Sequence, residues 1–227
     1  MDVQIDVGDR IGKVSGVLLR PADAWACFVL AHGAGAGMRH PFMEGIAQAL
    51  ARRGVATLRY QFPYMEAGGG RPDPPGVLEA TVRAAVDLAP TVAPGLPLVA
   101  GGKSLGGRMT SNAQARRPLP GVAALVFLGF PLHAPNQPGE SRAEHLNHVG
   151  VPMLFLQGTR DALAQLDLIT AVCHRLEPRA VLRVVQGADH SFAVLKRSGR
   201  SNAEVMDELA DTVASWSRSV SPGSHLG

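Results

Sequence analysis

The sequence predicts an α/β fold built on one mostly parallel, doubly wound sheet of about eight strands. Short apolar runs alternate with longer segments of helical period, which is the pattern of βαβ units. Several runs, such as Cys27–Leu30, are apolar at successive positions, as expected for strands covered on both faces. The length of 227 residues suits a single α/β domain, which we place at residues 1–218.

Short β-rich runs indicate where the strands lie. The first two runs alternate in polarity and are joined by the turn-prone Gly8-Asp9-Arg10, which indicates an antiparallel start to the sheet. The expected strands are Val3–Val7, Val14–Leu19, Ala26–Ala31, Val55–Arg59, Leu98–Gly101, Ala123–Leu128, Met153–Gln157 and Val181–Val185.

Five segments have helical period between and after these strands. Pro41 suits a first helical turn, and Gly54 suits a helix stop. The expected helices are Pro41–Arg52, Val77–Ala89, Ser104–Ala115, Ala162–Leu176 and Asn202–Ser217.

Two loops are expected to shape any pocket, namely Phe62–Gly76, with its Gly/Pro-rich part from Glu66, and His133–Ser141. Only about twenty residues separate the strand that ends at Leu128 from the next one, which leaves no room for a large cap domain. The site should therefore be open. Residues 219–227 are expected to form a frayed tail.

Composition excludes several classes of protein. The Lys and Arg residues are scattered, although the net charge is +3, so a nucleic-acid footprint is disfavoured. The longest apolar run is about half of what a membrane span needs. Cys27 lies in an apolar run and Cys173 in a helical pattern, which favours two buried free thiols over a disulfide. Because no secretory signal is evident, we expect a cytoplasmic protein without a membrane or nucleic-acid partner.

The most informative motif is Gly102-Lys103-Ser104-Leu105-Gly106. It places a serine between two glycines, directly after an expected strand and before an expected helix, which is the pattern of a nucleophile elbow. The sharp turn requires residues without side chains two positions before and after the serine. The amide of Leu105, at the helix N-terminus, is then placed to stabilise an oxyanion.

A serine nucleophile needs a base and an acid, and the sequence supplies both. Asp161 and His190 each follow an expected parallel strand, at the sheet edge where open α/β folds place their sites. The order Ser, Asp, His is the one that α/β-hydrolases use. Asp189 adjoins His190 and is the less favoured candidate acid, whereas Asp167 is expected to lie on a solvated helix face.

The loop His32-Gly33-Ala34-Gly35-Ala36-Gly37 follows the third expected strand, and the Ala34 amide is the favoured second oxyanion donor. A tight turn or an anion-binding nest is the structural alternative. A dinucleotide site is disfavoured because the glycine spacing is wrong, and Pro97 occupies the position of the first glycine of a phosphate-binding loop.

These motifs resemble the α/β-hydrolases, and more narrowly the compact dienelactone-hydrolase-like branch that includes the testis-expressed hydrolase-like protein and a chromatin-complex subunit. Arg59-Tyr60-Gln61-Phe62-Pro63-Tyr64, Gly158-Thr159-Arg160-Asp161 and Gly187-Ala188-Asp189-His190-Ser191-Phe192 carry the resemblance with the elbow and the glycine loop. It implies an α/β-hydrolase fold with Ser104 as nucleophile, Asp161 as acid and His190 as base. Dienelactone hydrolases proper use a cysteine nucleophile, so their substrate does not carry over.

The sequence therefore predicts a serine hydrolase for small soluble carboxylic esters or thioesters. No cofactor or metal is implied, and surface positions are favoured over a shared metal for His145 and His148. A scaffold used for protein interaction, with little or no turnover, is the alternative. The oligomeric state is not predicted.

His32, Phe62, Lys103 and Arg108 are candidate pocket residues. The His32 ring is expected to serve as a structural hydrogen-bonding group. Lys103 either reaches solvent or pairs with a carboxylate, or it raises the positive potential of the pocket and favours an anionic substrate. In that second hypothesis it acts with Arg108, Arg59 and Arg71.

Overall fold

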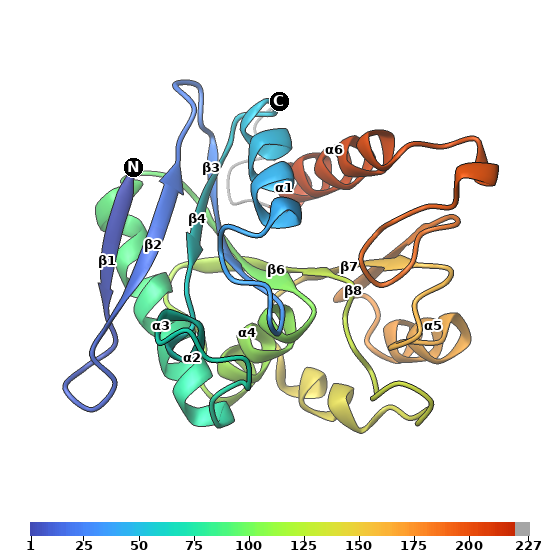
Figure 1. Ribbon diagram of the computed structural model, residues 1–227, viewed down its shortest axis with the longest axis horizontal. Coiled ribbons are helices and arrows are strands. Elements are labelled where there is room, and N and C mark those ends of the chain that lie inside the picture. The colour runs from blue at the N-terminus through green and yellow to red at the C-terminus, as the bar shows by residue number, and fades with distance from the viewer. Residues whose placement is uncertain (221–227) are drawn as a thin grey trace.

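The computed structural model describes residues 1–220, and at its centre lies one eight-stranded sheet in the order β1-β2-β4-β3-β5-β6-β7-β8 (Figure 1). Every expected strand is present within two residues of its expected ends. The strands are β1 (Asp2–Asp6), β2 (Lys13–Leu19), β3 (Ala26–Ala31), β4 (Val55–Tyr60), β5 (Leu98–Lys103), β6 (Val122–Leu128), β7 (Met153–Gly158) and β8 (Ala180–Val185).

The sheet begins antiparallel and continues parallel. β1 pairs antiparallel with β2, and β2 pairs antiparallel with β4, which confirms the expected start. All later pairings are parallel. The chain passes from β3 to β4 on one side and then returns to β5 on the other side of β3. The loops after β3 and β5 therefore meet at a topological switch point, where open α/β sheets form their sites.

Helices cover both faces of the sheet, as the doubly wound prediction requires (Figure 1). On one face, α1 (Pro41–Ala51) packs beside α6 (Asn202–Val220). The opposite face carries α3 (Pro75–Val92), α4 (Leu105–Arg116) and α5 (Leu166–Arg175). Short helical turns lie in the loops: α2 (Pro63–Glu66) and the 3₁₀ helices η1 (Ser141–His148) and η2 (Lys196–Ser198).

The continuous apolar strands feed two separate cores. In β3, Phe28 and Leu30 belong to the core under α1 and α6, while Cys27 and Val29 belong to the core under α3, α4 and α5. All four side chains are fully buried. A strand with helices on both faces has no solvent side, which explains why it does not alternate in polarity.

Three expected helices differ from the structure by three or more residues at one end. α3 runs from Pro75 to Val92 rather than from Val77 to Ala89. α5 begins at Leu166 rather than at residue 162, because Asp161 Oδ1 accepts a hydrogen bond from the Leu163 amide at 2.8 Å and holds a turn there. α6 continues through Val220 rather than ending at Ser217, and so includes the first two residues of the expected tail. Residues 221–227 lie outside the described residues.

The two cysteines and the helix lengths can be compared with what the composition predicts. Cys27 and Cys173 are buried free thiols, as expected, and burial raises the pKa of each to about 12. Both thiols therefore stay protonated near neutral pH. Within residues 1–220, no helix combines the length and apolar character that crossing a bilayer demands.

Candidate active site

Ser104 occupies a strained turn between β5 and α4. Its backbone has φ 50° and ψ −117°, a positive φ that a residue other than glycine rarely adopts. Glycines two positions before and after Ser104 let this turn pack closely against the end of β3. A Cβ on Gly102 would lie 2.2 Å from the Ala31 carbonyl oxygen, and one on Gly106 would lie 2.5 Å from that of His32. The elbow thus has the geometry that its motif predicts.

A continuous hydrogen-bonded chain runs from Ser104 through His190 to Asp161. His190 Nε2 lies 2.8 Å from Ser104 Oγ, and His190 Nδ1 lies 2.7 Å from Asp161 Oδ2. A carboxylate can only accept, so Nδ1 carries the hydrogen and Nε2 is left to accept the serine proton. Residues 86 positions apart in the sequence are brought together in this way.

Asp161 is held rigidly on the loop after β7. The side chain is buried, and Oδ1 accepts the Leu163 amide while Oδ2 also accepts a hydrogen bond from the side-chain amide of Gln157. Gln157 Oε1 in turn accepts the Phe130 amide at 3.0 Å. Gln157 was not among the residues predicted for the site. The signal that could have identified it is a polar residue near the end of a strand that is otherwise apolar.

Asp189 and Asp167 do not compete for this position. Asp189 Oδ1 accepts the amides of Ser191 and Ala193 at 2.8 and 2.9 Å, so this carboxylate closes the turn that carries His190. Asp167 is exposed in the first turn of α5. Among the described carboxylates, the His190 ring is hydrogen-bonded to that of Asp161.

The two expected oxyanion donors flank Ser104. Leu105 is the first residue of α4, and the first amides of a helix lack partners within it. The glycine loop runs beside the serine, since a Cβ on Gly33 would lie 3.6 Å from Ser104 Cβ. Ala34, the next residue, lines the cavity at the site, and the loop is anchored where the Gly35 amide donates to the Tyr64 hydroxyl at 3.3 Å.

A cavity of about 410 Å³ opens at Ser104 and His190. Its walls come from the glycine loop, the start of α1 and the loops that follow β7 and β8. The cavity is lined by the glycine loop, by Lys103, and by Ser104 and His190 themselves. The other lining residues are His40, Phe42, Met43, Leu163 and Ser191. The loops Phe62–Gly76 and His133–Ser141, which were expected to shape the pocket, do not line these walls directly. Each supports a wall residue instead, because the Tyr64 hydroxyl accepts the Gly35 amide and the His133 amide donates to the Leu163 carbonyl at 3.1 Å.

His32 and Phe62 are placed behind the glycine loop and not in the cavity, which corrects their assignment to the pocket. Both are fully buried. His32 Nδ1 lies 2.8 Å from the Gly33 carbonyl, and Nε2 accepts the Phe62 amide at 3.1 Å. Burial lowers the pKa of His32 to about 4, so the neutral ring ties the end of β3 to the end of β4. This is the structural role expected for His32.

Lys103 does line the cavity, and among the described residues its ammonium forms no ion pair. The residue is 9% exposed, and Nζ lies 6.0 Å from the centre of the Phe42 ring and 5.6 Å from that of Phe192. Burial lowers the pKa of Lys103 to about 8, an effect that the charges of Asp161 and Asp189 partly offset. The expected pairing with a carboxylate is therefore not seen within residues 1–220, and the ammonium instead makes cation–π contacts with two rings at the cavity wall.

The three arginines expected to act with Lys103 lie elsewhere. Arg108 belongs to α4 on the opposite face of the sheet, where burial and the nearby Arg142 lower its pKa. Arg59 is buried and donates to the Met38 carbonyl at 2.9 Å. Arg71 is exposed on its loop. None of them lines the cavity, so the assignment of Arg108 to the pocket is wrong.

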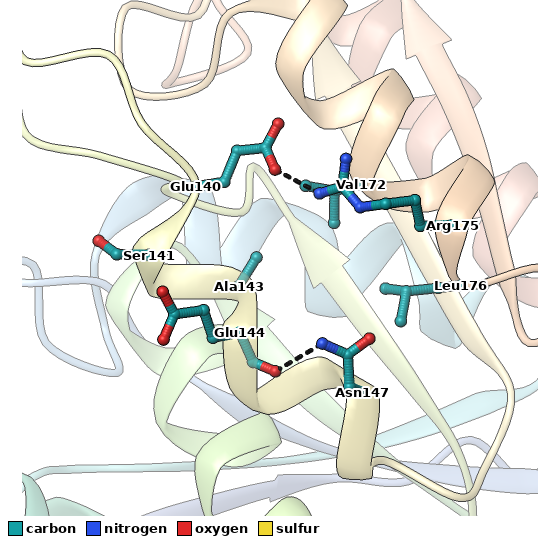
Figure 2. A pocket seen from close by; sticks show the side chains of 8 residues that line it. All are labelled: Glu140, Ser141, Ala143, Glu144, Asn147, Val172, Arg175 and Leu176. Atoms are coloured by element: carbon teal, nitrogen blue, oxygen red, sulfur yellow. Dashed lines mark hydrogen bonds and ion pairs between the residues drawn. The ribbon is translucent and has the colours of Figure 1, made fainter.

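A second cavity, of about 320 Å³, lies between η1 and α5 (Figure 2). It is crossed by the ion pair of Glu140 with Arg175, and Asn147 donates to the Glu144 carbonyl along its floor. Its lining includes none of the three hydrogen-bonded residues Ser104, His190 and Asp161. It is therefore separate from the candidate active site.

His145 and His148 behave differently from each other. His148 is exposed, as expected, whereas His145 is half-buried and its Nε2 lies 2.7 Å from Ser111 Oγ. Burial and the neighbouring Arg108 and His148 lower the pKa of His145 to about 4. Within the described residues, no three His, Cys, Asp or Glu side chains are grouped as a metal site would require.

Comparison with known proteins places this geometry in a family. A dienelactone hydrolase from Anabaena variabilis is similar in structure, with a TM-score of 0.76 at 24% sequence identity over 97% of each chain. A serine hydrolase without a lid from Xanthomonas campestris has a TM-score of 0.72 at 18% identity, covering 95% of this chain and 94% of that chain. An esterase domain from Rhodothermus marinus has a TM-score of 0.72 at 16% identity, covering 96% and 98%. At these identities the structures establish a shared fold, and residues 24–218 match the family model described as alpha/beta hydrolase domain, so the chain belongs to this family.

Proposed function

We propose that this chain is a serine hydrolase that cleaves small carboxylic esters or thioesters through an acyl-enzyme on Ser104. The observation that carries the proposal is the hydrogen-bonded chain from Asp161 through His190 to Ser104, which ends at a cavity. A serine hydroxyl becomes nucleophilic when a correctly oriented base removes its proton. Here the base, its orienting acid and the serine are already within hydrogen-bonding distance.

In the proposed mechanism, His190 Nε2 takes the proton of Ser104 as Oγ attacks the substrate carbonyl carbon. Asp161 holds the ring through Nδ1 and stabilises the imidazolium that forms. The tetrahedral intermediate then collapses, and His190 returns the proton to the departing alcohol or thiol. Water, activated by the same histidine, attacks the acyl-enzyme and releases the acid and free Ser104.

The amides of Leu105 and Ala34 are the proposed donors to the oxyanion. Leu105 contributes from the positive end of the α4 dipole, which favours negative charge at that point. Such preorganised donors act only when charge develops, and losing one typically costs about 10²- to 10³-fold in kcat.

The similar structures include a dienelactone hydrolase and an esterase domain, and ester cleavage is the chemistry that we carry over to this chain. On its motifs we also infer membership of the compact dienelactone-hydrolase-like branch with the testis-expressed hydrolase-like protein. The serine at position 104 argues against dienelactone itself as the substrate. We propose further that the protein acts in the cytoplasm.

A fluorophosphonate probe tests this proposal directly. We expect covalent labelling of the wild type and none of Ser104→Ala. Ser111→Ala is the matched control, because Ser111 is also hydrogen-bonded to a histidine but lies outside the cavity. It should be labelled like the wild type. Mass spectrometry of the labelled peptide identifies the modified serine, and thermal unfolding shows that each variant is folded.

A folded wild type that resists the probe and hydrolyses no ester in a screen of esters, thioesters and lactones would overturn the proposal. The fold would then serve as an interaction scaffold, which is the alternative. Labelling at a serine other than Ser104 would equally contradict the assignment of the nucleophile.

A further inference from the structure

Lys103 presents a buried cation at the candidate active site that the proposed chemistry does not use. It precedes Ser104 directly and ends β5, with its side chain on the face of the sheet covered by α1. The ammonium lies beside the His190 ring, since a Cβ on Gly129 would be 3.2 Å from Nζ and 3.5 Å from His190 Cε1. Positive charge thus stands close to the reacting atoms.

The nearby carboxylates do not pair with this ammonium. Both oxygens of Asp161 are hydrogen-bonded to other groups, and Asp189 Oδ1 accepts two backbone amides. Among the ion pairs and hydrogen bonds of the described residues, none involves Lys103 Nζ. The ammonium is instead held near the faces of Phe42 and Phe192, which attract a cation but do not neutralise its charge.

Among the described residues, no carboxylate belongs to the cavity lining, although the charges of Asp161 and Asp189 act on Lys103 from outside that lining. Lys103 is the only Lys, Arg, Asp or Glu side chain in the cavity wall as described, and the rest of the wall is backbone, apolar or neutral polar. A ligand in this cavity therefore meets the Lys103 ammonium directly. A ligand with a negative group would give Lys103 an ion-pair partner beside the apolar Phe42 and Phe192 rings.

We propose that Lys103 is a specificity-determining residue and that the substrates are anionic esters or thioesters with a carboxylate or equivalent anion a few bonds from the scissile carbonyl. The short separation follows from the position of the ammonium beside His190. The proposal rests on the proposed function, because it names the substrate class of the same site. It needs only Lys103, since Arg108, Arg59 and Arg71 do not reach the cavity.

Two esters of matched shape test the proposal: monoethyl succinate, which carries a carboxylate, and ethyl isocaproate, in which an isopropyl group replaces it. The readout is the ratio of their kcat/KM values at pH 7 and low salt. We expect the wild type to favour the succinate ester by about tenfold or more, mainly through a lower KM. Lys103→Met should abolish that ratio and Lys103→Arg should keep most of it. Raising the salt concentration should reduce it.

Arg108→Met is the matched control, because it removes a partly buried cation of α4 that does not line the cavity. It should leave the ratio unchanged. Equal kcat/KM values for both esters in the wild type, or a preference that survives in Lys103→Met, would overturn the proposal.

The result remains decisive if Lys103→Met fails to fold or if both esters are poor substrates. Protection of wild-type Ser104 from the fluorophosphonate probe is then compared for succinamate and isocaproamide. Stronger protection by the anionic succinamate supports the proposal, and equal protection contradicts it. Failure of the probe to label Ser104 at all would instead refute the proposed function, so the two failures are distinguishable.

Discussion

Ser104 with His190 and Ser111 with His145 are two Ser–His pairs of nearly equal length, 2.8 and 2.7 Å, on the same β5–α4 segment. Only the first pair has a carboxylate on the far ring nitrogen. In the second pair, burial of His145 and the nearby Arg108 disfavour a cationic ring. The environment of a pair, and not its length, determines whether the histidine can act as a base.

The direction of the proton also differs between the pairs. The Ser111 hydroxyl donates its one hydrogen to the Arg108 carbonyl at 2.9 Å, so its bond to His145 requires the ring to donate. Ser104 has no such carbonyl acceptor among the described residues, so its hydrogen is directed to His190. Ser111 is also in the interior of a helix and outside the cavity, whereas Ser104 is raised on a strained turn.

The largest expected effect separates the two histidines. His190→Gln removes the base and should lower kcat/KM for a simple ester by about 10⁴-fold or more, as in other triads. His145→Gln keeps a side-chain N–H for Ser111 and should change kcat/KM by less than about twofold. Steady-state kinetics of both purified variants measures the difference. Activity of His190→Gln within tenfold of the wild type would show that another group serves as the base.

The next effect separates the two acids near His190. Asp161→Asn should lower kcat by about 10³- to 10⁴-fold, because an amide in that position no longer fixes the tautomer that accepts the serine proton. Asp189→Asn keeps an oxygen for the amides of Ser191 and Ala193 and should reduce kcat only slightly. Comparison of the two kcat values decides the matter. The reverse ranking would make Asp189 the acid.

The strands, the helices on both faces of the sheet and the residues that meet at Ser104 could be predicted from the sequence. These follow from local patterns, because the ends of parallel strands meet at one edge of the sheet whatever their order. Which residues line the pocket does depend on that order. His32 and Phe62 contact each other behind the glycine loop, and not in the cavity, because β3 lies beside β4 with Ala31 opposite Tyr60. Nothing in the local sequence specifies that pairing.

Lys103 and Arg108 show the same limit within a single motif. They are five positions apart, yet the sheet separates them, because Lys103 leaves β5 toward α1 while Arg108 lies on α4 on the opposite face. A motif specifies residue types and spacing, but the face that a side chain takes depends on the pleat of the strand and the packing of the helix. The position of Lys103 in the cavity wall, without a carboxylate paired to it among the described residues, could be recognised only in three dimensions.

The smallest expected effect concerns stability in acid and again distinguishes His145 from His190. The pKa of His145 is about 4 in the fold and about 6.5 in the unfolded chain. Above pH 6.5 the His145 ring is neutral in both the folded and the unfolded state, so its full contribution to the free energy of unfolding is present. Between pH 6.5 and 4 the unfolded chain binds a proton that the folded state does not, so the free energy of unfolding falls as the pH falls.

His145 is only half-buried, so we discount the full shift and expect a loss of about 1 to 2 kcal/mol from this residue. Fully buried His32 should add about 3 kcal/mol over the same range, by the same sign. Urea unfolding near pH 7.5 and pH 4.5 measures the fall. Because His145→Gln cannot titrate, its fall should be smaller than that of the wild type by the His145 contribution. Parallel losses in the two proteins would mean that the folded state protonates His145 as readily as the unfolded chain does, and the contrast with His190 would then rest on Asp161 alone.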